Sequence, residues 1–292
     1  IPANSVTAAS GNQEGIFGFG YISGPADETN LVSNTGVVAS DVTGVGTARY
    51  YIAACEYGGD KGIFGFGDGP NNETNLVSNT GVVASDVAGV GTARWGVGAC
   101  SFGGDKGIFA YGHAAGGVVS MSNLVSNAGV VASDVTGVGT ARHQLAACSY
   151  GEDKGIFGFG TTGSYTAVTN LVSNSGVVAS DVTGVGTART VAACRYGGDK
   201  GIFGFGYGNS NVSLTNLVSN AGVVATDTTG VGTARRYAAA CEYGSDKGIF
   251  GFGYSNSNVS MTNLVSNAGV VASDQAATTG TARKGLGACS FN

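Results

Sequence analysis

The sequence predicts an all-β protein, and three observations lead to that fold class. First, the chain of 292 residues consists of six near-copies of one unit, each containing Asn-Leu-Val-Ser-Asn and ending in Thr-Ala-Arg. Second, the unit is only 45 to 48 residues long, which is too short to bury its own apolar face without neighbours. Third, short runs of Val, Ile, Phe and Tyr alternate with Gly and Asn turns, and no helical period is present.

The copy from Tyr50 to Val87 shows how one unit divides into strands. Its apolar runs are separated by Gly-Gly-Asp, by a loop of variable sequence and by Asn-Thr-Gly. Gly and Asn tolerate the positive φ angles of tight turns, so these segments are expected to reverse the chain. The expected antiparallel strands are A (Ile52–Tyr57), B (Lys61–Gly67), C (Thr74–Asn79) and D (Val82–Asp86).

Four short antiparallel strands repeated six times are typical of a β-propeller blade set. The sequence therefore predicts a six-bladed β-propeller of four-stranded blades that forms a single domain over residues 1–292. Lys284–Phe291 matches the first strand of the repeat, so we expect it to close the ring beside Gly15–Gly20 and to displace Ser5–Ser10 to an edge. The alternative is a β-solenoid, whose ends would need polar caps.

Three features of the repeat resemble the kelch family. An Arg precedes the first strand, the apolar second strand runs into Gly, and the third strand contains Asn. WD-type repeats are not matched, because the sequence contains no Trp-Asp pair. The chain departs from the kelch pattern where Gly-Phe-Gly replaces Gly-Gly after strand B and where the spaced Tyr and Trp of later strands are absent. The kelch-like resemblance implies a propeller whose loops bind a ligand.

Composition excludes several functional classes. Only 11% of residues are charged, the net charge is -5 and no basic run occurs, so we expect no nucleic-acid partner. No apolar run reaches the length of about 18 residues that a membrane span needs. The sequence begins with Ile1 rather than Met, so we expect a processed product or a fragment.

One Cys recurs at the same position of every repeat. Equivalent positions in a ring lie a whole unit apart, beyond the Cα separation of about 7 Å that a disulfide tolerates, so free buried thiols are expected. A ring of metal ligands is the alternative, but zinc requires about four converging ligands. We therefore expect no metal and no cofactor. The six residues are Cys55, Cys100, Cys148, Cys194, Cys241 and Cys289.

An Arg and an Asp also recur in every repeat. Buried charges are nearly always paired, so we interpret these residues as structural, each Arg binding an Asp or carbonyls across its own Asp-to-Arg loop. A charged binding annulus is the alternative. The residues are Arg49, Arg94, Arg142, Arg189, Arg235, Arg283, Asp41, Asp86, Asp134, Asp181, Asp227 and Asp274.

The sequence offers little material for catalysis. Its two His, His113 and His143, belong to different repeats and have no repeated partner. Nucleophilic catalysis needs a base that is oriented by a third group, and no spacing nominates one. We therefore expect no enzymatic activity, with a site at the channel mouth as the remaining enzymatic alternative.

The six copies differ at two places, between strands B and C and directly after the Arg. In an up-and-down meander both connections emerge on one face, around the channel mouth. Their Tyr, Trp, Arg, His, Asn and Ser are typical of recognition loops on a rigid scaffold. Unrestrained drift of surface loops is the alternative explanation. The predicted ligand-binding residues are Tyr50, Tyr51, Trp95, His113, His143, Gln144, Thr190, Tyr207, Arg236, Tyr237, Tyr254 and Lys284.

These observations favour a non-enzymatic binding propeller that recognises a protein or a glycan through one face. The alternative is a structural or decoration module of a phage or another large assembly, for which a weakly charged array rich in Gly, Ser, Asn and Thr is suitable. Both hypotheses favour a location outside the cell or on the surface of a particle.

Overall fold

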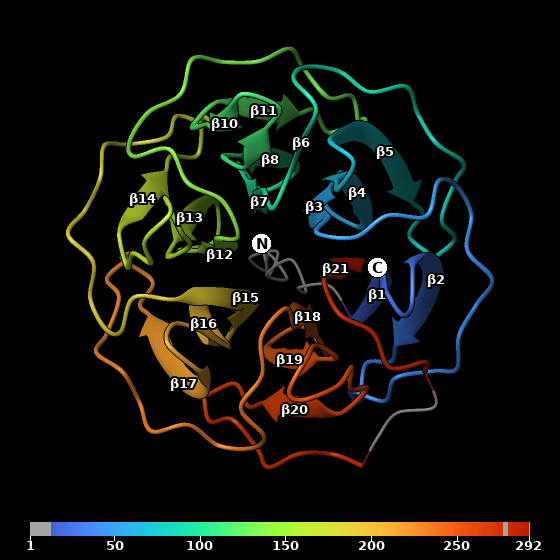
Figure 1. Ribbon diagram of the computed structural model, residues 1–292, viewed down its shortest axis with the longest axis vertical. Helices are drawn as coiled ribbons and strands as arrows, with labels where there is room; N and C mark the ends of the chain where they lie inside the picture. The colour runs from blue at the N-terminus through green and yellow to red at the C-terminus, as the bar shows by residue number, and fades with distance from the viewer. Residues whose placement is uncertain (1–12, 277–279, 292) are drawn as a thin grey trace, which may run out of the picture.

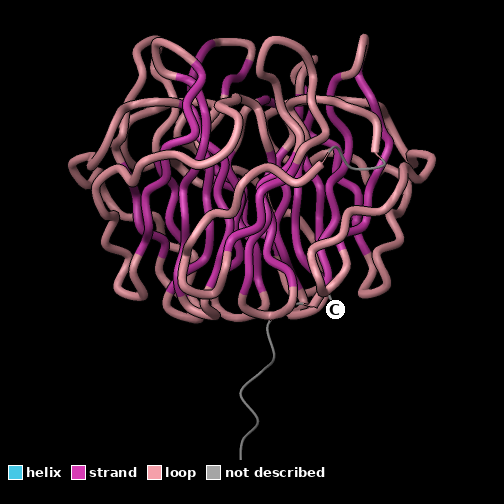
Figure 2. The backbone as a smooth tube through the Cα atoms, turned by 90° about the horizontal axis from the view of Figure 1, so that it is seen from below, coloured by secondary structure: helices cyan, strands magenta, loops and turns pink. Residues whose placement is uncertain are grey.

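The computed structural model describes residues 13–276 and 280–291, and every regular element in that range is a β-strand. Six three-stranded antiparallel sheets, one for each repeat, surround a central axis (Figure 1). Figure 2 shows that their strands run between two faces covered by loops. The described range contains no helix long and apolar enough to cross a membrane. Ser5–Ser10, predicted to lie at an edge, falls outside the described residues.

Each sheet has an inner strand near the axis, a middle strand and an outer strand (Figure 1). The inner strands are β3 (Ala53–Tyr57), β7 (Gly98–Phe102), β12 (Ala146–Tyr150), β15 (Thr190–Tyr196), β18 (Ala239–Tyr243) and β21 (Gly287–Phe291). The middle strands are β1 (Glu14–Tyr21), β4 (Lys61–Gly67), β8 (Lys106–Ala110), β13 (Lys154–Gly158), β16 (Lys200–Tyr207) and β19 (Lys247–Gly251). The outer strands are β2 (Pro25–Val32), β5 (Asn71–Val77), β11 (Ser122–Val125), β14 (Thr169–Val172), β17 (Asn211–Val218) and β20 (Thr262–Val265). A small seventh sheet joins β6 (Arg94–Trp95), β9 (His113–Ala114) and β10 (Gly117–Val118).

The expected fourth strand of each repeat is not a strand in the structure. Its segment makes only isolated bridges to the outer strand, such as Thr74 with Val87 and Val77 with Val83. Between these bridges the Asn75 side chain donates hydrogen bonds to the Ala84 carbonyl and the Asp86 carboxylate, at 3.0 and 2.9 Å. The side-chain amide thus replaces some of the backbone hydrogen bonds that a fourth strand would make. The prediction of four strands is corrected to three strands with an edge segment that makes isolated bridges.

The last and first repeats share one sheet. The sequence predicts that Lys284–Phe291 joins the strand at Gly15–Gly20, and the structure pairs β21 with β1 in antiparallel register, from Glu14 opposite Phe291 to Gly18 opposite Gly287. Two segments from opposite ends of the chain therefore form one sheet. In it, β21 is the inner strand and β1 the middle strand, as in the sheets of the other repeats.

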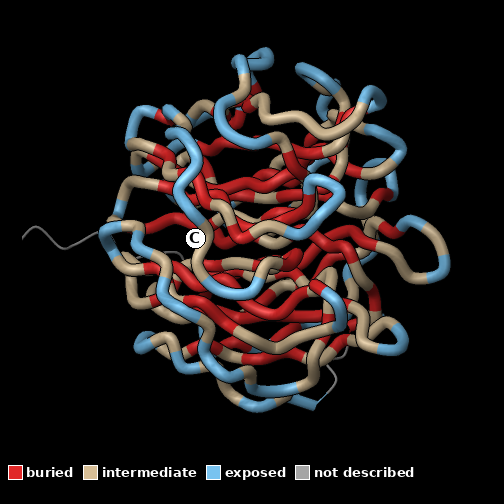
Figure 3. Tube along the Cα trace, turned by 60° about the vertical axis from the view of Figure 1, so that its left-hand side comes forward, coloured by how far each residue is buried: buried red, intermediate tan, exposed pale blue. Residues whose placement is uncertain are grey.

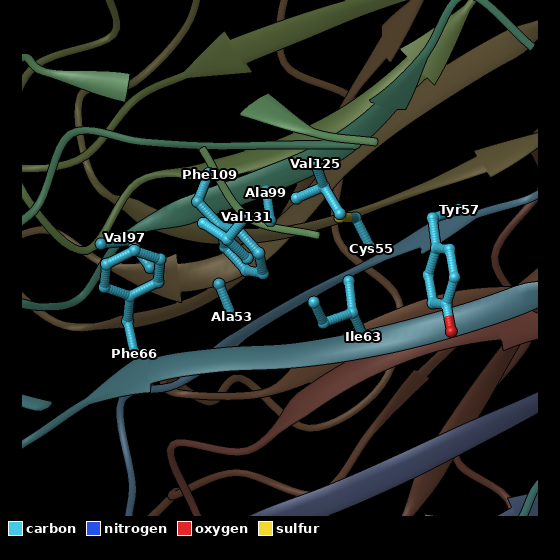
Figure 4. Close-up of a cluster of buried hydrophobic side chains, with 10 residues drawn as sticks. All are labelled: Ala53, Cys55, Tyr57, Ile63, Phe66, Val97, Ala99, Phe109, Val125 and Val131. Atoms are coloured by element: carbon cyan, nitrogen blue, oxygen red, sulfur yellow. The ribbon is translucent and has the colours of Figure 1, made fainter. Parts of the chain in front are cut away.

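The middle strands form the most buried layer of the molecule (Figure 3). In β4, Ile63, Phe64 and Phe66 have no exposed surface, which explains why the strand reads as apolar on both faces. Phe66 contacts Phe109 of the next sheet with ring centroids 5.1 Å apart, and Figure 4 shows the cluster around this pair. The equivalent contact between Phe17 and Phe252, at 5.2 Å, joins the first and last repeats.

Close contact between neighbouring sheets also explains the small residues of the repeat. A Cβ atom built at Gly62 would lie 2.4 Å from Cys289 Sγ, and one built at Gly107 would lie 2.6 Å from Cys55 Sγ. Each Cys of an inner strand therefore packs against the glycine of the next middle strand. All six Cys are free and buried, as the sequence predicts.

The constant Arg residues join consecutive repeats. Arg49 donates to the Thr47 carbonyl at 2.9 Å, to the Phe66 carbonyl at 3.0 Å and to the Asn75 side chain. Its ion-pair partner is Asp86 of the following repeat, 3.6 Å away. The predicted contact with a carbonyl of the same Asp-to-Arg loop is confirmed at Thr47, but the predicted Asp partner from that loop is wrong, because the loop carries the Arg from the outer edge of one sheet to the next sheet. Arg283 continues the pattern with Asp41 at 3.5 Å.

Candidate functional site

Backbone pairing brings the two variable parts of the repeat together at one end of the axis. The residue after each Arg is joined through its backbone to a residue at or just beyond the end of a middle strand, as Trp95 is to His113 and Lys284 to Tyr21. Because these two positions are joined in this way, their side chains emerge next to each other. The loops of every repeat thus contribute to one surface, which we name the mouth face.

Backbone hydrogen bonds link consecutive repeats around this mouth. Gly285 N donates to the Tyr237 carbonyl at 2.9 Å, Tyr51 N to the Gly285 carbonyl at 2.8 Å and Gly96 N to the Tyr51 carbonyl at 3.0 Å. Gln144 N continues the series by donating to the Gly96 carbonyl at 2.7 Å. All five residues adopt left-handed backbone conformations, with φ between 52° and 67°. Residues other than Gly rarely adopt this conformation. Because these residues share it in spite of their different side chains, the conformation is imposed by the fold.

The series is interrupted after the fourth constant Arg, Arg189. Five residues separate Arg from Cys in the other repeats, whereas only four separate Arg189 from Cys194. Without the extra residue, Thr190 enters β15 directly and pairs with Tyr207. Thr190 is 5% exposed, so it lies beneath the surface rather than on it. The mouth is therefore asymmetric, with an interruption between Gln144 and Tyr237.

Aromatic side chains cover the side of the mouth formed by the residues that follow the first three constant Arg. The Tyr51 ring stacks on Trp95 with centroids 5.4 Å apart, and it contacts Tyr50 at 4.8 Å and Tyr237 at 5.2 Å. Trp95 in turn contacts His113 at 5.2 Å and His143 at 4.8 Å. A continuous platform of aromatic rings results.

Two cations lie beside this platform, since Arg236 contacts the Tyr237 ring and Lys284 contacts the Tyr21 ring. The Arg236 guanidinium carbon lies 4.6 Å from the Tyr207 ring centroid, and Lys284 Nζ lies 4.6 Å from the Tyr254 centroid. Both side chains are half-buried. Cation–π attraction of this kind contributes on the order of 1 kcal/mol and orients the side chain.

A cavity of about 80 Å³ lies at the centre of the mouth. Tyr51, Gln144, Thr190, Tyr237 and Gly285 are among the residues that line it. A Cβ atom at Gly285 would lie 3.2 Å from the Tyr51 ring, so the absence of a side chain there lets Tyr51 reach Tyr237. The cavity is large enough for a small group of a ligand, while the surrounding rings provide a wider contact surface.

Burial and neighbouring groups shift the pKa values of two polar side chains of the mouth. Burial lowers the pKa of His143, and the neighbouring His113 lowers it further, so the His143 imidazole is neutral at pH 7. The Nδ1 atom of His143 is buried and has no hydrogen-bond partner. A hydrogen bond to Asp68, together with burial, raises the pKa of Tyr50 to about 12, so this phenol also stays neutral. His143 and Tyr50 therefore add no charge to the aromatic side of the mouth.

The predicted ligand-binding residues meet in this one region. Tyr50, Tyr51, Trp95, His113 and His143 form the platform. Gln144 lines the cavity. The cationic side contains Tyr207, Arg236, Tyr237, Tyr254 and Lys284. Thr190 lines the same cavity but is buried, and its hydroxyl accepts a hydrogen bond from Tyr207 N at 3.3 Å. Tyr21 and Tyr165 also belong to the surface, through contacts with Tyr50 and Tyr207.

A second cluster lies inside the channel and was not found by sequence reasoning. It lines a cavity of about 60 Å³ between the inner strands. Glu56 accepts a hydrogen bond from Ser101 at 3.1 Å. Burial raises the pKa of Glu56, and Arg195 opposes that rise. Glu242 is 2% exposed, and its Oε1 atom has no hydrogen-bond partner. The sequence signal was available, because the residue after each Cys varies among Glu, Ser and Arg.

The described residues contain no group of three or more His, Cys, Asp and Glu side chains that could hold a metal ion. The Cys thiols are directed at glycines of neighbouring strands rather than at one another. Burial raises the pKa of Cys148 to about 12, so this sulfur stays protonated and is a poor ligand.

Comparison with known proteins adds no relative. No family model matches the chain, and no curated protein matches it.

Proposed function

We propose that this chain is a six-bladed, kelch-like β-propeller whose mouth face binds a glycan or a protein, and that it performs no catalysis. Six equivalent sheets around one axis support the propeller. The pairing of β21 with β1 and the ion pair between Arg283 and Asp41 support closure of the ring. In the kelch-like repeat, the Arg that precedes each first strand has a structural role in joining neighbouring blades.

The convergence of the variable residues carries the binding proposal. The repeats agree wherever side chains hold the scaffold together, and they differ where side chains meet around the mouth. Unrestrained drift would leave the variable residues unrelated to one another. Here they form a continuous platform of half-buried rings beside two cations, and Tyr, Trp and Arg are the residue types that dominate binding energy at interfaces.

A glycan is the ligand class that this surface suits best. Sugar rings present flat C–H faces that pack on aromatic rings, and the sugar hydroxyls find partners among Asn and Ser of the surrounding loops. Asn209, Ser210, Asn256 and Ser257 are exposed in the loops that follow Tyr207 and Tyr254. A small cavity lined by both apolar and polar groups is a common arrangement for recognising such ligands.

The test is a glycan-array screen of the purified chain with fluorescence of Trp95, the sole Trp, as a second readout. We expect saturable binding that shifts the Trp95 emission. Trp95→Ala should weaken binding about tenfold or more, as expected for an aromatic anchor. Phe102→Leu, in the core away from the mouth, is the matched control and should leave affinity unchanged. Binding that survives Trp95→Ala unchanged would contradict the proposed location.

One observation favours the second candidate function, a structural module of a larger assembly such as a virion. Each repeat exposes one valine at the same position, with exposed fractions of 64 to 66%. Such a regular apolar ring suits repeated packing against other subunits. Replacement of these valines by Ser should abolish self-association in sedimentation experiments if the assembly hypothesis holds. The valines are Val37, Val82, Val130, Val177, Val223 and Val270.

A further inference from the structure

Two positive side chains on the mouth face converge on one tyrosine. Lys284 Nζ lies 4.6 Å from the Tyr254 ring centroid, and the Arg236 guanidinium carbon lies 5.2 Å from the same centroid. The ten ion pairs of the described residues include neither cation. In a protein with a net charge of -5, two neighbouring cations without a carboxylate partner are notable, because they repel each other.

The Arg236 side chain also has unused hydrogen-bonding capacity. Its Nε atom is buried and has no hydrogen-bond partner. Its guanidinium packs among the rings of Tyr207, Tyr237 and Tyr254, at 4.6, 5.2 and 5.2 Å. These contacts hold the guanidinium plane in place but accept none of its N–H groups. A guanidinium held in this way presents a fork of donors that matches a carboxylate.

The loops around the two cations are tied to each other. Asn258 donates from its side chain to the Tyr21 and Ile22 carbonyls, at 3.1 and 2.9 Å. Asn211 does the same to the Tyr254 and Ser255 carbonyls, at 3.4 and 2.9 Å. The rings that flank Arg236 and Lys284 are thus carried by connected loops, which reduces the ordering needed on binding.

Comparison of the six repeats shows that the charge is confined to one side. The residue that follows the constant Arg is Tyr, Trp, His or Thr in four repeats, and a permanent cation only in the last two. Both cations therefore occur in consecutive sheets. The fold does not require a cation at this position, since four of six repeats do without one.

We infer that the mouth face binds an acidic sugar, whose carboxylate lies between Arg236 and Lys284 while its ring contacts the adjoining tyrosines. This inference rests on the proposed function and specifies its ligand class. An acidic peptide would satisfy the two cations equally well, but it would make less use of the flat tyrosine surfaces and of the exposed Asn and Ser beside them.

The test is isothermal titration of the whole chain with trigalacturonic acid, a hyaluronan tetrasaccharide and 3′-sialyllactose, each compared with its carboxyl methyl ester. We expect at least one acid to bind, with its ester about 10- to 100-fold weaker, because a charge-assisted contact is lost. Arg236→Gln combined with Lys284→Gln should lower the affinity for the acid to that for the ester. The matched control is Lys154→Gln, which removes a positive charge at the start of β13, away from the mouth face, and should have no effect.

The remaining outcomes separate this inference from the proposed function. Equal binding of acid and ester, lost in Trp95→Ala, would overturn the acidic-sugar inference and keep the mouth face as a glycan site. Stronger binding of hexaglutamate than of any sugar acid would overturn the sugar and identify an acidic peptide. If none of these acids binds but neutral glycans bind on the array, the inference is also overturned. Failure of every glycan would overturn both. Melting temperatures of the variants within a few degrees of the parent would show that the effects arise from binding.

Discussion

Replacement of Glu242 by Gln should make the protein more stable at alkaline pH and leave its stability unchanged at acidic pH. Glu242 is 2% exposed inside the channel. Burial raises the pKa of its carboxyl group from 4.5 to about 8, Glu56 and Asp246 raise it further, and Arg195 opposes the rise. The folded protein therefore holds a proton that the unfolded chain releases at much lower pH.

The sign of the effect follows from proton linkage. Below pH 4.5 the carboxyl group is neutral in both states, so its contribution to the free energy of unfolding is constant. Between pH 4.5 and about 8 only the folded state binds the proton, so stability falls as pH rises. A rise from 4.5 to about 8 corresponds to an upper limit of roughly 5 kcal/mol. Gln is neutral at every pH and removes this loss.

Thermal unfolding measured between pH 4 and pH 9 provides the assay. At pH 9 the Glu242→Gln variant should melt above the parent by several degrees, with an upper limit of roughly 10 to 20 °C for a chain of this size. The difference should vanish near pH 4. Glu152→Gln makes the same chemical change at an exposed turn and is the matched control. A variant that melts below the parent at every pH would refute the reasoning and indicate that Glu242 is an ionised partner of Arg195.

Three further predictions test the scaffold. Gly62→Ala should lower the free energy of unfolding by about 1 to 3 kcal/mol, because its Cβ would lie 2.4 Å from Cys289 Sγ. In urea unfolding, the double variant with Cys289→Ala should regain most of the lost stability. A double variant as unstable as Gly62→Ala would show that the clash lies elsewhere. Arg94→Met should cost about 3 to 5 kcal/mol in the same assay because it leaves buried hydrogen-bond acceptors unpaired, whereas Lys61→Met, at a partly exposed position, should change little. A thiol reagent should label none of the six buried Cys before unfolding and all six in denaturant; rapid labelling of the native protein would contradict the packing.

The sequence alone determined the repeat, the strand class and the variable surface. Strand B was predicted at Lys61–Gly67 and is observed as β4 with the same bounds, because glycine spacing and continuous apolar character are local properties. The role of Lys284–Phe291 also followed from the sequence, since its match to the first strand of the repeat indicates the missing partner of β1. The two variable positions were visible as differences between copies.

Tertiary structure decided how the repeats contact each other. Arg49 pairs with Asp86 of the next repeat because the connecting loop crosses between sheets, and no sequence spacing distinguishes that partner from Asp41. The segment at Val82–Asp86 has strand-like composition, but the Asn75 side chain takes the place of ladder hydrogen bonds. The channel cluster of Glu56, Arg195 and Glu242 depends on the axis bringing together residues that lie more than 40 positions apart. Periodicity defines each unit, whereas contacts across the axis and between neighbours depend on the angle at which the sheets pack.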